Sequence, residues 1–137
     1  MSDTGERPER PQVWHEYRMN HAINVAWLGW SVSTAQMYAL EDAWDSLVVN
    51  EEWRDWHQAH LRGSSAFLYL AVRDGLPARR LRKTRNGASL QLPASELVEA
   101  ERDGTLIPVF RGVIRDLYAR WAEGHGVPAP PELPASE

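Results

Sequence analysis

His57 and His60 are the residues whose type and spacing come nearest to a metal-binding pattern. They form an HxxH pair, and residues three apart are neighbours on one face of a helix. Imidazole nitrogen is a common ligand for zinc and other transition metals, but such sites need at least three converging ligands. A small helical metalloprotein or enzyme that uses His57 and His60 is therefore kept as an alternative. A core histidine that is satisfied by a hydrogen bond is the more common outcome.

Other catalytic signatures are absent from the sequence. It contains no cysteine, which excludes thiolate metal sites, disulfides and cysteine nucleophiles. It also lacks a nucleophile elbow, a phosphate-binding glycine loop, a dinucleotide fingerprint and a zinc knuckle. We therefore assign no catalytic residue, expect no cofactor, and favour a non-enzymatic role.

Tryptophan is concentrated in the first half of the chain. Six of the seven tryptophans fall between residues 14 and 56. Trp14, Trp27, Trp30 and Trp44 are best explained as core residues that pack helices together. Trp53 and Trp56 lie among charged residues in EEWRDWH, which is typical of an interface hot spot. We therefore predict that Trp53, Trp56 and Arg54 bind a partner, most simply another protein.

A basic segment precedes the strongest turn signal in the chain. Five of the seven residues from 79 to 85 are cationic: Arg79, Arg80, Arg82, Lys83 and Arg85. The following Asn86-Gly87 favours a two-residue hairpin turn, so we predict a β-hairpin over about residues 79–92. A basic two-stranded ribbon can lie on phosphates or enter a DNA groove. A DNA-binding transcriptional regulator is therefore the second alternative function.

The run from Asn86 to Val98 resembles a segment of swapped-hairpin transcription factors and antitoxins of the AbrB and MazE type. The resemblance lies in the glycine, the Leu92-Pro93 pair and the short helix expected after it. In those families this segment helps to build a dimeric DNA-binding β-structure, so the resemblance implies contact with DNA. The spacing from glycine to proline differs, and we do not assign the chain to that group.

Helices are the elements that have to position these residues. Apolar periodicity predicts a first helix over about residues 12–30. A second helix begins at Ser33, where Ser33 and Gln36 have the spacing of a capping box. A third helix follows Asn50 and continues through Leu70 to a stop signal at Asp74-Gly75. After the hairpin we expect a short helix over about 93–102, an extended stretch over 105–110, and a last helix over about 109–123 that ends at Gly124.

The predicted fold is mainly α, an antiparallel bundle of three or four helices with a small hairpin inserted before the last long helix. Residues 1–11 are expected to be disordered, residues 12–123 to form one domain, and residues 124–137 to be a disordered proline-rich tail. The longest uncharged stretch, residues 19–40, holds too many polar side chains for a helix that faces lipid, so we expect no membrane span.

These observations predict a small regulatory or assembly protein that acts by binding a macromolecule. The first residues lack the apolar core of a signal peptide, which favours the cytoplasm. Fourteen arginines stand against one lysine, a bias typical of GC-rich genomes, so we expect a bacterial source. The net charge of −4 argues against a general nucleic-acid coat. Because aromatic surface is often buried between copies, a homodimer is a further expectation.

Overall fold

The computed structural model describes residues 23–61, 68–73 and 87–132. In chain order, the elements are β1 (Ile23–Leu28), α2 (Thr34–Val49), α3 (Glu51–Leu61), β2 (Leu68–Arg73), β3 (Ala88–Pro93), α4 (Ala94–Asp103) and α5 (Leu106–His125). The three strands form one parallel sheet in the order β1-β2-β3. The predicted antiparallel bundle with an inserted hairpin is therefore wrong.

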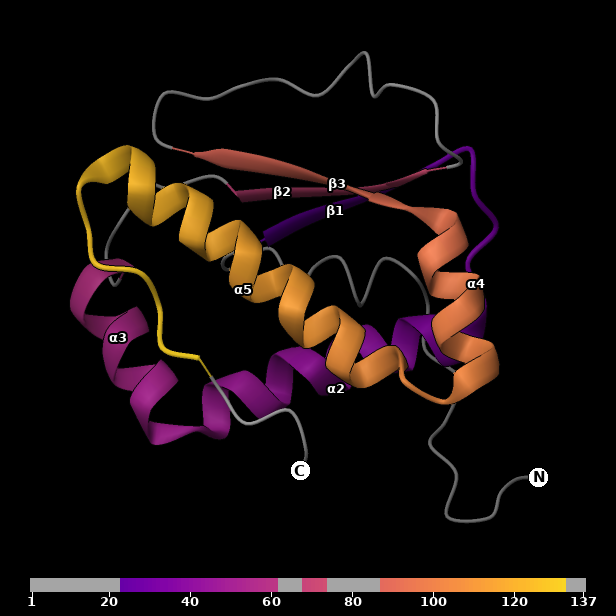
Figure 1. Ribbon diagram of the computed structural model, residues 1–137, viewed down its shortest axis with the longest axis horizontal. Helices are drawn as coiled ribbons and strands as arrows, with labels where there is room; N and C mark the ends of the chain where they lie inside the picture. Colours follow the sequence, from indigo (N-terminus) through magenta and orange to yellow (C-terminus); the bar gives the residue numbers. More distant parts are fainter. Residues whose placement is uncertain (1–22, 62–67, 74–86, 133–137) are drawn as a thin grey trace.

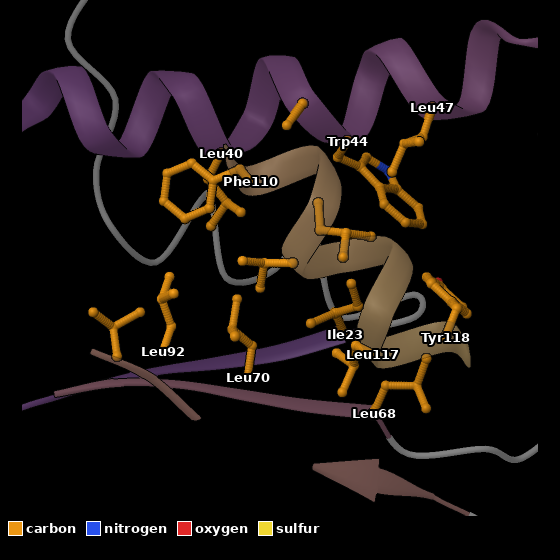
Figure 2. Packing of buried hydrophobic residues seen from close by; sticks show 14 of the residues in the cluster. Ile23, Leu40, Trp44, Leu47, Leu68, Leu70, Leu92, Phe110, Leu117 and Tyr118 are labelled. Carbon is orange, nitrogen blue, oxygen red and sulfur yellow. The ribbon is translucent and has the colours of Figure 1, made fainter. Parts of the chain in front are cut away.

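The sheet, α5 and α2 form successive layers. α5 makes extensive contacts with β2 and β3 on one side and with α2 on the other. In Figure 1 the helices all lie to one side of the sheet, and α5 runs diagonally between it and α2. Figure 2 shows Leu70 and Leu92 rising from the strands, Phe110 and Leu117 between the layers, and Leu40 descending from α2.

Strand register explains which side chains enter this core. Leu70 lies opposite Val25 and Leu90 across the three strands, and residues two positions apart point to the same face. The row that points toward α5 is almost wholly apolar and consists of Ile23, Val25, Trp27, Leu68, Leu70, Val72, Ala88, Leu90 and Leu92. β2 is the central strand, and its near-continuous apolar run is typical of strands in parallel sheets.

Two predicted helices contain strands: β1 lies in the first, and β2 lies in the later part of the third. β1 occupies 23–28 of the helix predicted over 12–30, whose remaining residues 12–22 lie outside the described part. α3 does begin after Asn50, whose side-chain oxygen accepts a hydrogen bond from Trp53 N–H at 3.0 Å, but it ends at Leu61 rather than continuing to Leu70. In both places a run of large apolar residues suits a helix and a strand equally well, and pairing within the sheet decides between them.

The hairpin predicted over 79–92 is also wrong as a fold element. Its expected second strand is β3, which pairs in parallel with β2 rather than antiparallel with a neighbour in sequence. Residues 79–86 lie outside the described ranges. The parallel pairing also differs from the dimeric hairpin structure that the AbrB and MazE resemblance implies.

The later helices follow the sequence more closely. The helix expected over 93–102 is α4, and the last helix is α5. The stretch 105–110 is not extended, because α5 already begins at Leu106. α5 ends at Gly126 rather than Gly124; Gly126 has φ of +68°, a left-handed conformation that glycine adopts without a steric penalty.

A polar network ties the start of α2 to α4. Ser33 and Gln36 form the predicted capping box: Gln36 N–H donates to Ser33 Oγ at 3.0 Å, and Ser33 N–H donates to Gln36 Oε1 at 3.1 Å. Gln36 Nε2 and Ser33 Oγ both donate to Glu101 Oε1, and Trp30 Nε1 donates to Gln36 Oε1. Because Gln36 is buried and its amide is satisfied on both sides, this network has a structural role at the carboxyl end of the sheet.

Candidate functional site

An aromatic cluster centred on Tyr118 fills the space between α2, α3 and α5. The Tyr118 side chain is fully buried. Its ring lies edge-on to Trp53 at 5.1 Å and to Trp56 at 5.9 Å between centroids, and it stacks on Trp44 at 6.3 Å. Such pairs add to the stability that burial of their area provides. In Figure 2 the Tyr118 ring lies at the end of the core below Trp44 and Leu47.

Tyr118 and His57 form a polar pair within this cluster. The Tyr118 hydroxyl lies 3.3 Å from His57 Nε2. Burial raises the pKa of Tyr118 well above its usual value, so the phenol stays protonated and its O–H can donate to the imidazole. Burial also lowers the pKa of the half-buried His57, which favours the neutral ring that accepts this bond.

The lowered pKa of His57 predicts a dependence of stability on pH. The unfolded chain binds a proton at this histidine near pH 6.5, and the folded protein binds it only at lower pH. The contribution of His57 is therefore complete above about pH 6.5 and is lost as the pH falls through the lowered pKa. His57→Gln should flatten the decline of the urea midpoint between pH 7.5 and 5 relative to the parent protein. An unchanged decline in His57→Gln would contradict this prediction.

Trp56 connects the aromatic cluster to the C-terminal part of the chain. Its ring packs edge-on to Trp121 at 6.4 Å, and its indole Nε1–H donates to the carbonyl oxygen of Pro128 at 2.8 Å. On the same side Trp121 stacks on His125 at 4.7 Å, and His125 Nδ1 bonds the Trp121 carbonyl. Trp56 therefore has one edge in the core and its polar edge at the surface of α3.

Residues 127–132, which we call the proline-rich segment, lie across the face formed by α3 and α5. The segment starts where Val127 N–H donates to Ala122 O at 2.9 Å. Arg115 on α5 donates from Nη2 to Pro130 O at 3.1 Å and from Nε to Pro131 O at 3.4 Å, and it lies 3.6 Å from the Glu132 carboxylate. Pro130 is buried. The tail expected to be disordered from residue 124 is thus held against the protein as far as residue 132.

The structure separates the residues predicted to bind a partner. Trp53 is 0% exposed and Trp56 9%, so both side chains belong to the core. Arg54 is exposed between them and donates to Val48 O at 3.3 Å. Of the two tryptophans, only Trp56 reaches a surface. It does so through its indole N–H edge, which the proline-rich segment contacts. Arg115 and Tyr118 are not among the residues predicted to bind a partner, although both lie on a well-predicted helix.

The two histidines are directed at different rings. His57 faces Tyr118 and lies edge-on to Trp44, whereas His60 packs against Trp56 at 5.6 Å. Within the part of the chain that the structure describes, no group of three or more histidine, aspartate or glutamate side chains could hold a metal ion. The basic residues 79–85, on which the DNA-binding alternative depends, lie outside the described residues, so this alternative stays a prediction.

A separate groove lies near the N-terminal end of α2. This groove of about 330 Å³ is lined by Ala35, Tyr38, Ala39, Asp42, Gly104, Leu106, Ile107 and Pro108. Its lining is mainly apolar, and the structure seats no chain segment in it among the described residues. The face formed by α3 and α5 is therefore the better candidate, because it already holds an extended chain segment through specific donors.

Comparison with known proteins identifies no relative: no family model, no curated protein and no solved structure matches this chain. None of the helices in the described ranges is both long enough and apolar enough to cross a membrane.

Proposed function

We propose that this protein is a cytoplasmic regulatory or assembly protein that acts by binding another protein. The binding surface in this proposal is the face formed by α3 and α5, with Trp56 and Arg115 as its hydrogen-bond donors. The observation that carries the proposal is the 2.8 Å hydrogen bond from Trp56 Nε1–H to the carbonyl of Pro128, in a chain segment seated on that face.

The chemistry of this face supports a peptide ligand over a small molecule. Trp56 and Arg115 donate to main-chain carbonyls, which every peptide offers. Tryptophan and arginine are also the residue types most enriched in the energetic centres of protein interfaces. The rigid aromatic cluster beneath them holds the Trp56 indole in position before a ligand binds, which lowers the entropy lost on binding.

The test is affinity capture with a variant that ends at Gly126 and so leaves the face uncovered. Proteins from cells that produce the chain should bind this variant and be lost when it also carries Arg115→Glu. Arg102→Glu on α4 is the matched control, because Arg102 is an exposed arginine that contacts only Glu99 and Asp103 among the ion pairs described. An identical set of captured proteins with Arg115→Glu would exclude this face, and nucleic acid in the eluate would instead favour the DNA-binding alternative.

A further inference from the structure

The proline-rich segment has a backbone that its own sequence holds extended. Pro128, Pro130 and Pro131 have φ fixed near −65°, and a residue before proline is biased away from the helical region. Three of the six residues are proline, and Val127, Ala129 and Pro130 each precede one. The unbound segment therefore already populates an extended, polyproline-like conformation and loses little conformational entropy when it binds.

The hydrogen-bonding groups of the segment and of the face are complementary. Proline has no backbone N–H, so at Pro128, Pro130 and Pro131 the backbone of the segment offers only carbonyl acceptors. The groups of the face that contact these carbonyls are the indole N–H of Trp56 and the guanidinium of Arg115. Both groups donate hydrogen bonds, and neither offers an acceptor. A segment without prolines would add backbone N–H groups, for which these two side chains provide no acceptor.

The lengths of the two elements also match. The segment leaves α5 at the bond to Ala122 and returns along the helix to Arg115. At 1.5 Å per residue, this part of α5 is about 10 Å long. A polyproline-like chain rises about 3.1 Å per residue, so residues 130 and 131 lie about 9–12 Å beyond residue 127. The segment is therefore long enough to bring the carbonyls of Pro130 and Pro131 to Arg115.

We propose that the α3–α5 face is a recognition site for extended proline-rich segments with an acidic residue after the prolines, of the form Pro-x-Pro-Pro-Glu, and that residues 127–132 are its ligand in cis. This inference rests on the proposed function and names the partner chemistry. Arg115 recognises the acidic residue of the motif, because the Glu132 carboxylate lies 3.6 Å from the Arg115 guanidinium. A partner that carries such a segment binds only when the chain's own segment leaves.

The covalent link makes the chain's own segment a strong competitor. A segment joined directly to the end of α5 is present at an effective concentration of about the millimolar range. The apparent affinity for a partner is the affinity of the open face multiplied by the fraction of molecules whose face is open. The C-terminal segment thus sets a threshold that favours tight or multivalent proline-rich partners.

The experiment titrates a fluorescent peptide of residues 127–137 into the variant that ends at Gly126 and into the full chain. The peptide should bind the shortened variant and bind the full chain at least about tenfold more weakly. In the shortened variant, Trp56→Phe, which keeps an aromatic ring but loses the N–H, and Arg115→Gln should each weaken binding about two- to tenfold, the usual net contribution of a hydrogen bond that water can replace. Arg102→Gln is the matched control and should not change it.

Peptide variants test the predicted partner chemistry. Replacement of Pro128, Pro130 and Pro131 by alanine should abolish measurable binding, and Glu132→Gln should weaken binding and reduce its dependence on salt. Circular dichroism checks that the shortened variant is folded; if it is not, the full chain with those three prolines replaced takes its place.

Two outcomes overturn the inference. One is a folded protein with an open face that does not bind the peptide, and the other is equal binding of the alanine-substituted peptide. If either occurs while capture still depends on Arg115, the face binds a partner of different chemistry and only the inference fails. If capture does not depend on Arg115, the proposed function fails as well.

Discussion

Replacement of Trp53 by alanine should lower the free energy of unfolding by about 3–5 kcal/mol, the usual cost of removing a large aromatic side chain from a core. Trp53 is completely buried, and its ring packs on Trp56 at 5.5 Å and on Tyr118 at 5.1 Å. These two rings belong to α3 and α5, so they cannot close over the cavity unless the two helices move. Urea unfolding followed by circular dichroism measures the change.

The neighbouring residue provides a sharp control. Arg54 is exposed on the same helix, and Arg54→Ala should change the free energy of unfolding by less than about 0.5 kcal/mol. Trp53→Phe should cost less than Trp53→Ala, because it keeps a ring in the cluster. A loss of under about 1 kcal/mol for Trp53→Ala would show that the side chain is not in the core and would revive it as a partner-binding residue.

Leu70→Asp in the central strand should prevent folding, since it removes more than about 4–5 kcal/mol from a domain of ordinary stability. Leu70 is completely buried, and its side chain points from β2 toward α5 between Val25 and Leu90. A carboxylate there would lose its hydration, and the surrounding side chains are apolar, so its desolvation would be uncompensated. The far-ultraviolet spectrum and the urea transition of the purified variant report the effect.

A position on the edge strand next to this residue provides the matched substitution. Gln91 lies on β3 with its side chain exposed, directly after the residue paired with Leu70. Gln91→Asp introduces the same charge into the same sheet and should stay within about 0.5 kcal/mol of the parent protein. A folded, stable Leu70→Asp variant would contradict the parallel sheet, because in a different fold this residue could face solvent.

The parts of the fold that the sequence predicts well are those with local signals. Ser33 and Gln36 cap α2 as expected, and the apolar spacing of α5 identifies its buried face. The strands fail for a physical reason. Ile23, Val25 and Trp27 alternate, which suits a strand, but they also continue a longer run of apolar residues that suits a buried helix. Only pairing with β2 distinguishes the two, and that pairing joins residues about 45 positions apart.

The charge of sequence neighbours does not show whether a tryptophan lies in the core or at the surface of this protein. The charged neighbours of Trp53 and Trp56 suggested a surface, and Glu51, Glu52, Arg54 and Asp55 are indeed exposed. Residues three apart on a helix share a face, however, and this face of α3 is turned toward Tyr118. The composition of the proline-rich segment predicts disorder. Composition cannot indicate the hydrogen bonds that the segment accepts from Trp56 and Arg115, which lie elsewhere in the chain.

The indole N–H signal of Trp56 in a ¹H–¹⁵N spectrum tests most directly whether the α3–α5 face holds a proline-rich segment. Trp56→Phe assigns the signal. In the full chain the signal should be shifted downfield and exchange slowly with solvent, because the N–H donates to Pro128 O. In the variant that ends at Gly126 it should move upfield, and the peptide of residues 127–137 should return it. A signal that stays in the same position in all three samples would contradict binding of the segment at this face.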